Sequence, residues 1–167
     1  MKQRVQSILF FLSAIILGLL FFVPMSSYLN EGTYYKLFVY GIHEESLDLG
    51  VELPFSAIYT LPMLILTVAV ILISFYISMS IFRAVKLVQF EKLFKLSRIN
   101  IALTAVLVAT YFVYYMMKTG APVAAAPSFL WPAWGAFFPL VALIMMLIAS
   151  SGLRNDIKKV RSVDRIR

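Results

Sequence analysis

The sequence has no cysteine, a single histidine and few charged residues for its length. Without cysteine, it holds neither a disulfide framework nor a thiolate metal site. Charged residues make up 14% of the 167 residues, whereas soluble domains carry about a quarter, so this chain has too few charges to coat a globule in water. Because 62% of the residues are hydrophobic, the composition indicates a membrane protein.

Four long apolar runs, at about residues 5–23, 55–82, 99–117 and 134–151, contain no Asp, Glu, Lys, Arg or His. A helix needs about 20 apolar residues to cross the hydrocarbon core of a bilayer, and each run approaches or exceeds that length. The first run is followed by VPMSS, which lacks a signal-peptidase cleavage pattern, so we expect it to be retained. The sequence predicts one all-α membrane domain, a four-transmembrane-helix bundle with helices at about residues 5–23, 55–88, 90–117 and 134–151.

Positive charge is confined almost entirely to one side of the predicted spans. Thirteen of the fifteen Lys and Arg residues lie before the first apolar run, between the second and third, or after the fourth; only Lys36 and Lys118 lie in the other loops. Lys and Arg in short loops remain on the cytoplasmic side of a membrane. We therefore predict a multi-pass protein with both termini in the cytoplasm. Since topology accounts for the net charge of +7, we expect no nucleic-acid partner.

The basic segments also predict contacts at the cytoplasmic surface. In the tail, residues 152–167, Leu153, Ile157 and Val160 recur at helical spacing, which predicts a short amphipathic helix on the membrane. Each basic residue near an anionic lipid surface contributes about 1 kcal/mol of attraction, and a docking partner is the alternative. The predicted membrane-surface or partner contacts are Arg83, Lys86, Lys92, Lys95, Arg98, Lys158, Lys159, Arg161, Arg165 and Arg167.

The loop after the first span contains strand patterns on the opposite side. Residues 33–41, TYYKLFVYG, are rich in the aromatic and branched residues that favour strands. In residues 46–54, SLDLGVELP, apolar and polar residues alternate with a period of two. Joined through IHEE, the two segments predict a small extracytoplasmic β-hairpin at residues 33–53. Three prolines predict irregular structure in the second outer loop, residues 118–134.

Pairs of small residues four positions apart occur in three of the predicted spans. Such pairs let helices approach closely in lipid, either within one chain or against another subunit. The predicted helix-packing residues are Ala14, Gly18, Ser74, Ser78, Ala105 and Ala109.

One cluster of potential ligands lies outside the predicted spans: His43, Glu44, Glu45 and Asp48. Neighbouring residues of a strand point to opposite faces, so these side chains would not converge as a metal site requires. We predict a non-enzymatic protein with no catalytic residue, no metal site and no cofactor. The remaining enzymatic alternative takes its chemistry from a bound cofactor, which an absorption spectrum would reveal.

The apolar runs of the predicted spans also lack the charged groups that usually mark an ion path or a proton relay. Four uncharged helices leave little room for two rocking halves unless the protein oligomerises. A small transporter or channel for an apolar or amphipathic molecule is the functional alternative. Its aromatic and hydroxyl groups would include Tyr59, Thr60, Tyr111 and Tyr115.

Three segments resemble an uncharacterised family of four-helix integral membrane proteins of Bacteroidota. They are KQRVQSI at residues 2–8, FFPLVAL at residues 137–143 and KKVRSVDRIR at residues 158–167. Gln89 matches a glutamine in the family's central basic turn, although the surrounding RAVKLVQ departs from the pattern. The resemblance covers the whole chain and implies a bacterial inner-membrane location with the same four-helix topology. It implies no activity.

Uncharged spans, basic cytoplasmic surfaces and an outer hairpin together favour a non-enzymatic accessory or scaffold subunit of a membrane protein complex. Its expected partners are anionic headgroups of membrane lipids at the cytoplasmic face and a protein partner subunit or a second copy of the chain. Proteins that co-purify from the native membrane would test this prediction.

Overall fold

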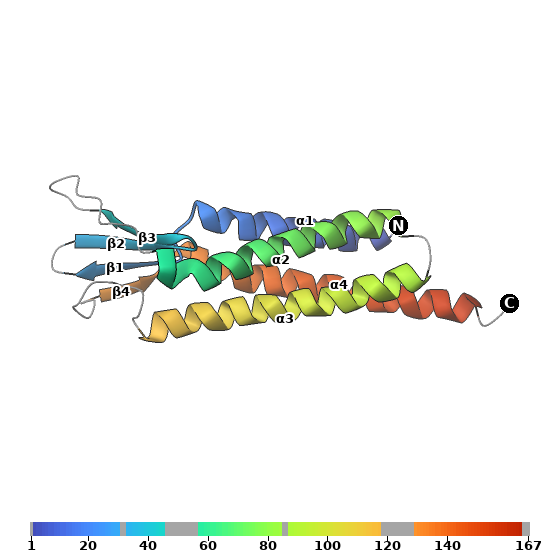
Figure 1. Cartoon of the computed structure of the whole chain (residues 1–167). Helices are drawn as coiled ribbons and strands as arrows, with labels where there is room; N and C mark the ends of the chain where they lie inside the picture. Colours follow the sequence, from blue (N-terminus) through green and yellow to red (C-terminus); the bar gives the residue numbers. More distant parts are fainter. Residues whose placement is uncertain (1, 31–32, 46–56, 85–86, 118–128, 165–167) are drawn as a thin grey trace.

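Four helices and a small sheet make up the computed structural model, which describes residues 2–30, 33–45, 57–84, 87–117 and 129–164 (Figure 1). The mainly helical architecture is confirmed. The helices are α1 (Lys2–Gly18), α2 (Ala57–Arg83), α3 (Leu87–Met117) and α4 (Phe138–Asp164), with short 3₁₀ segments η1 (Leu19–Phe21) and η2 (Trp134–Phe137). The strands are β1 (Ser26–Asn30), β2 (Thr33–Phe38), β3 (Gly41–Glu45) and β4 (Phe129–Pro132).

Among the described residues, three helical segments are long and apolar enough to cross a membrane: Thr60–Arg83, Val88–Val113 and Trp134–Lys159. The first apolar helical segment, Val5–Phe21, is shorter. At 1.5 Å per residue, such a segment is about 25 Å long, close to the thickness of the hydrocarbon core.

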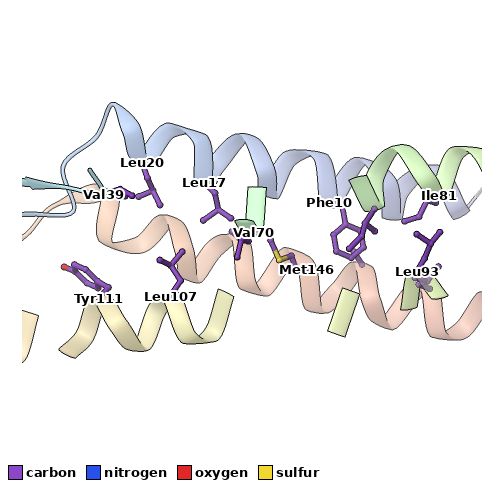
Figure 2. Packing of buried hydrophobic residues seen from close by; sticks show 14 of the residues in the cluster. Phe10, Leu17, Leu20, Val39, Val70, Ile81, Leu93, Leu107, Tyr111 and Met146 are labelled. Carbon is purple, nitrogen blue, oxygen red and sulfur yellow. The ribbon is translucent and has the colours of Figure 1, made fainter. Parts of the chain in front are cut away.

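The helices form an antiparallel bundle in which each one packs against two neighbours. α1 contacts α2 and α4, and α3 contacts the same two helices from the other side. Apolar side chains fill the bundle axis from the sheet to the opposite end (Figure 2). Leu17, Val70, Leu107 and Met146 are fully buried along this axis. Because every helix contributes a buried stripe, the four segments are held as one unit.

α4 continues without interruption from Phe138 to Asp164, so the prediction of a separate helix lying on the membrane surface is wrong. The apolar stripe of the tail has a different partner from the one expected. Leu153 and Ile157 are buried in the same hydrophobic cluster as the rest of the bundle. Their burial against neighbouring helices makes the extension of α4 part of the bundle.

The four strands form one antiparallel sheet in the order β3-β2-β1-β4. The predicted hairpin strand at residues 33–41 is found as β2, but its turn lies earlier than expected. Phe38 pairs with Gly41, so Val39 and Tyr40 form the turn and IHEE belongs to β3. The alternating stretch at residues 46–54 lies outside the described residues.

β4 lies in the second outer loop, whose prolines predicted irregular structure. It pairs with β1, with Ser26 opposite Pro132 and Leu29 opposite Phe129, so the prediction of irregular structure is wrong for residues 129–132. Proline is tolerated in edge strands, where its missing N–H is not needed by a neighbouring strand. β4 is an edge strand in this sheet, and Pro132 is its last residue.

The sheet joins the bundle at Pro24 and Met25, between α1 and β1. The Met25 N–H donates to the Leu37 carbonyl at 2.7 Å, and the Met25 carbonyl accepts from the Ala133 N–H at 3.1 Å. The Tyr111 hydroxyl of α3 also donates to that carbonyl at 3.1 Å. Met25 is therefore hydrogen-bonded to β2, to α3 and to the segment before α4. We call this end of the bundle, which carries the sheet, the sheet end.

Candidate functional site

Two serines connect α1 to α2 inside the end of the bundle opposite the sheet. The Ser7 hydroxyl lies 2.7 Å from the Ser78 carbonyl, and the Ser78 hydroxyl lies 2.9 Å from the Ser7 carbonyl. The two hydroxyls are 3.0 Å apart, and both residues are buried. Small side chains let the helices approach closely, and their hydroxyls find partners that lipid cannot supply.

Asn100 is the centre of a second polar group, between α2, α3 and α4. Its amide nitrogen donates to the Ser74 hydroxyl at 2.7 Å and lies 3.6 Å from the Met146 sulfur. The Thr104 hydroxyl donates to the Asn100 carbonyl at 2.8 Å. Asn100 Oδ1 is buried without a hydrogen-bond partner. The group fixes the relative position of three helices within the apolar interior.

Gln6 reaches from α1 to the extended part of α4. Its side-chain amide donates to Asp156 Oδ2 at 2.8 Å, although the two residues are 150 positions apart in sequence. Gly152 makes room for this contact, because a Cβ there would lie 2.9 Å from Gln6 Nε2. A groove of about 670 Å³ between the two helices is lined by Gln6, Asp156, Lys158 and other residues.

Both termini lie at the end of the bundle opposite the sheet (Figure 1). Exposed Lys and Arg residues gather toward this end, which we call the cationic end. An ion pair between Arg161 and Glu91 connects α4 to α3 there. Both partners are partly exposed, so this pair contributes little to stability by itself. The cationic end comprises the exposed residues Arg83, Lys92, Lys95, Arg98, Arg154, Lys158, Lys159 and Arg161.

The structure separates the predicted surface contacts into three grooves. Arg83 and Lys92 line a groove between α2 and α3 of about 230 Å³. Lys158 and Lys159 line the groove between α1 and α4. Arg98 lines a third groove, between α3 and α4, together with Arg154, which was not among the predicted contacts.

The other five predicted contacts are not assigned to any of these grooves. Lys95 and Arg161 are exposed on α3 and α4. Lys86, Arg165 and Arg167 lie outside the described residues.

The predicted small-residue pairs have different environments. Ala14 is buried, and Ser74 and Ser78 are buried with the hydrogen bonds described above. Gly18 has no neighbour that a Cβ would approach within 4 Å. Ala105 and Ala109 are exposed on the outer face of α3. Only the first three residues therefore pack inside this chain.

The structure describes only part of the cluster of potential ligands, His43, Glu44, Glu45 and Asp48. His43 on β3 packs edge-on against Phe38 and Tyr40, with ring centroids 5.2 and 5.4 Å away. Asp48 lies outside the described residues. No group of three His, Cys, Asp or Glu residues that could hold a metal ion occurs within the described ranges.

Two of the four hydroxyl-bearing residues predicted for a transport path have described side chains. Thr60 and Tyr111 are buried, and Tyr111 bonds to Met25 at the sheet end. Tyr59 belongs to α2 and Tyr115 to α3, but their side chains lie outside the described part of the structure.

Sequence reasoning missed Gln6, Asn100, Ser150 and Arg154. Asn100 begins the apolar run of α3, where an isolated amide could have indicated a buried contact. Arg154 directly follows the apolar run of α4, at the level where a headgroup would lie. Their partners were not predictable, because Gln6 and Asp156 are brought together only by the bundle.

Comparison with known families places the chain in one of them. A family described as "Domain of unknown function (DUF4293)" matches residues 2–166, and the chain belongs to this family. No curated protein matches the sequence. The family carries no assigned activity, so the function has to be argued from the architecture.

Proposed function

We propose that this chain is a four-span integral protein of a bacterial inner membrane and serves as a non-enzymatic accessory or scaffold subunit. The observation that carries the proposal is the division of the molecule into a cationic end and a sheet end, joined by an uncharged, packed bundle. Such a protein presents two separate surfaces across one bilayer.

The distribution of charge supports a cytoplasmic location for the cationic end. All exposed Lys and Arg residues of the described helices are at that end, and Lys36 is the described cation of the sheet. The positive-inside rule relates this arrangement to orientation. Trp134 is exposed beside the sheet, as expected of an aromatic residue at the outer interface. Both termini would then be cytoplasmic.

The packing of α1 supports its role as the fourth span. Gln6 contacts Asp156 at the cationic end, and Leu20 of the following 3₁₀ segment is buried near the sheet. The segment thus runs beside its neighbours along most of the bundle (Figure 1). A helix tied to two spans throughout its length would share their environment.

The packed interior favours a structural role over a transport path. Phe10, Leu17, Val70 and Met146 are fully buried and occupy the region between the helices (Figure 2). Side chains packed at normal protein density leave little room for a solute. The transporter alternative would need an opening of the described bundle.

The outer face of α3 supports a helix of another subunit as the partner. Ala102, Ala105 and Ala109 are exposed there at helical spacing. Small residues at such positions let a second helix approach closely in lipid. The partner surface is therefore expected along this alanine stripe.

Purification in a mild detergent would test the proposal. The tagged chain should co-purify with a stoichiometric membrane protein or with a second copy of itself. Ala105→Leu with Ala109→Leu should abolish the complex, because larger side chains keep the helices apart.

Val68→Leu with Val141→Leu is the matched control, since both valines are exposed but belong to α2 and α4, away from the alanine stripe. This variant should retain the partner. A stable monomer in several mild detergents, or equal loss of partner from both variants, would contradict the proposal.

A further inference from the structure

The groove between α3 and α4 at the cationic end has a volume of about 410 Å³ and a graded lining. Ile101 and Leu147 lie toward the middle of their helices and supply apolar surface. Arg98 and Arg154 lie toward the cationic end and supply two guanidinium groups. The lining therefore changes from apolar to cationic along the direction that would cross a membrane interface.

Hydroxyl groups lie between the apolar and cationic parts of the groove. Ser150 and Ser151 line it, and the Ser150 hydroxyl lies 3.1 Å from that of Ser97 on α3. This hydrogen bond joins the two helices at the level of the groove. The Arg98 guanidinium lies over the Phe94 ring, 5.9 Å from its centroid, which favours a position beside the groove.

The cations of the groove have no described carboxylate beside them. None of the described lining residues is acidic. Glu91 is paired with Arg161, and Asp156 accepts a hydrogen bond from Gln6 on the α1 side of α4. Because these acids are engaged elsewhere, Arg98 and Arg154 give the groove a net positive charge.

We propose that this groove binds one anionic glycerophospholipid. Arg98 and Arg154 hold its phosphate, with Ser151 at the glycerol level, and an acyl chain lies against Ile101 and Leu147. Guanidinium groups match phosphate oxygens in pairs of parallel hydrogen bonds, and basic pockets between membrane helices suit anionic headgroups. The apolar half of the groove favours a lipid over a free phosphate or an acidic peptide.

Lipid titration of the full chain tests this site independently of any protein partner. The protein would be purified in a nonionic detergent, stripped of lipid and titrated with dioleoyl phosphatidylglycerol while native mass spectrometry counts bound lipids. Dioleoyl phosphatidylcholine, with the same chains and no net charge, should bind more weakly. Arg98→Gln with Arg154→Gln should weaken phosphatidylglycerol binding by roughly 30-fold and remove most of the preference over phosphatidylcholine.

Three further variants separate a site from general surface charge. Lys95→Gln removes an exposed cation one helical turn from Arg98, outside the described groove lining. It should weaken binding by less than about twofold, whereas Arg98→Gln alone should weaken it by about fivefold. Ser151→Phe keeps both arginines but fills the groove, so it should also reduce phosphatidylglycerol binding.

Three outcomes would overturn the proposal. They are equal weakening by Lys95→Gln and Arg98→Gln, undiminished binding in Ser151→Phe, and equal affinity for the two lipids. Displacement of phosphatidylglycerol by inorganic phosphate alone would assign the site to free phosphate. Circular dichroism would verify that every variant retains the helix content of the original chain.

Discussion

Gly135 and Gly152 lie at opposite ends of the bundle. Gly135 leaves room for a neighbouring backbone, whereas Gly152 leaves room for a neighbouring side chain. A Cβ on Gly135 would lie 2.5 Å from the Pro24 carbonyl oxygen, which is a backbone atom. A Cβ on Gly152 would lie 2.9 Å from Nε2 of Gln6, the far end of a flexible side chain. The sheet end therefore resists change at this contact, whereas the cationic end can adjust.

Hydrogen bonds show the same difference between the ends. At the sheet end, backbone groups join separate elements, as in the bond from the Gly135 N–H to the Pro24 carbonyl at 3.2 Å. At the cationic end, side chains make the connections, including Ser7 with Ser78 and Gln6 with Asp156. Side-chain rotation lets a surface accommodate a ligand without moving its helices, which suits the end proposed to bind a lipid.

The largest predicted effect is that of Gly135→Ala at the sheet end. The new methyl group must displace the Pro24 backbone, and overpacking of this kind costs about 3 kcal/mol. Unfolding in mixed detergent micelles, followed by circular dichroism, would measure the loss. Gly18→Ala is the matched control, because no atom lies within 4 Å of its Cβ position. Equal stability of the two variants would break the distinction between the ends.

Tyr111→Phe should have the next largest effect. It removes the hydroxyl that donates to the Met25 carbonyl and leaves the ring in place, at a cost of about 1 kcal/mol. The same unfolding measurement applies. Val113→Leu, on the exposed face of α3, is the control for a side-chain change at this level that removes no hydrogen bond. An unchanged stability would show that Tyr111 does not help to fix the sheet.

The helical part of the fold could be predicted because each helix carries its own signal. An apolar run long enough for a bilayer identifies a helix without knowledge of its neighbours. β4 lacks such a signal, since its four residues become a strand only by pairing with β1, about a hundred positions earlier. The proline at its end then pointed to the wrong structure.

The candidate site was predictable in its charges and not in its geometry. Positive side chains near Arg98 and after Leu153 were evident from the sequence, but the groove that pairs Arg98 with Arg154 depends on how α3 and α4 align. The tail was misread for a related reason. Its apolar stripe indicated a buried face, and only the bundle shows that Leu153 and Ile157 bury that face against other helices.

A double-mutant cycle on Ser7 and Ser78 would sharpen the description of the cationic end. Each single change to alanine removes one hydroxyl of the reciprocal pair, and the coupling between them should be about 0.6 kcal/mol, as is usual for hydrogen bonds inside membranes. Additive effects of the two substitutions would show that the serines act through size alone. Ser80→Ala, on the same helix and outside this pair, is the control.

The smallest predicted effect is that of Gly152→Ala, because two contributions of similar size to the free energy of unfolding oppose each other. Alanine favours a helix interior over glycine by about 1 kcal/mol, while the new methyl group displaces Gln6 from Asp156 and loses a hydrogen bond of about the same value. The net change should lie within about 0.5 kcal/mol in the original chain. In a Gln6→Ala background the clash is gone, so Gly152→Ala should stabilise the protein by about 1 kcal/mol. If it destabilised both backgrounds equally, the backbone of α1 and not the Gln6 side chain would limit this contact, and the two ends of the bundle would be alike.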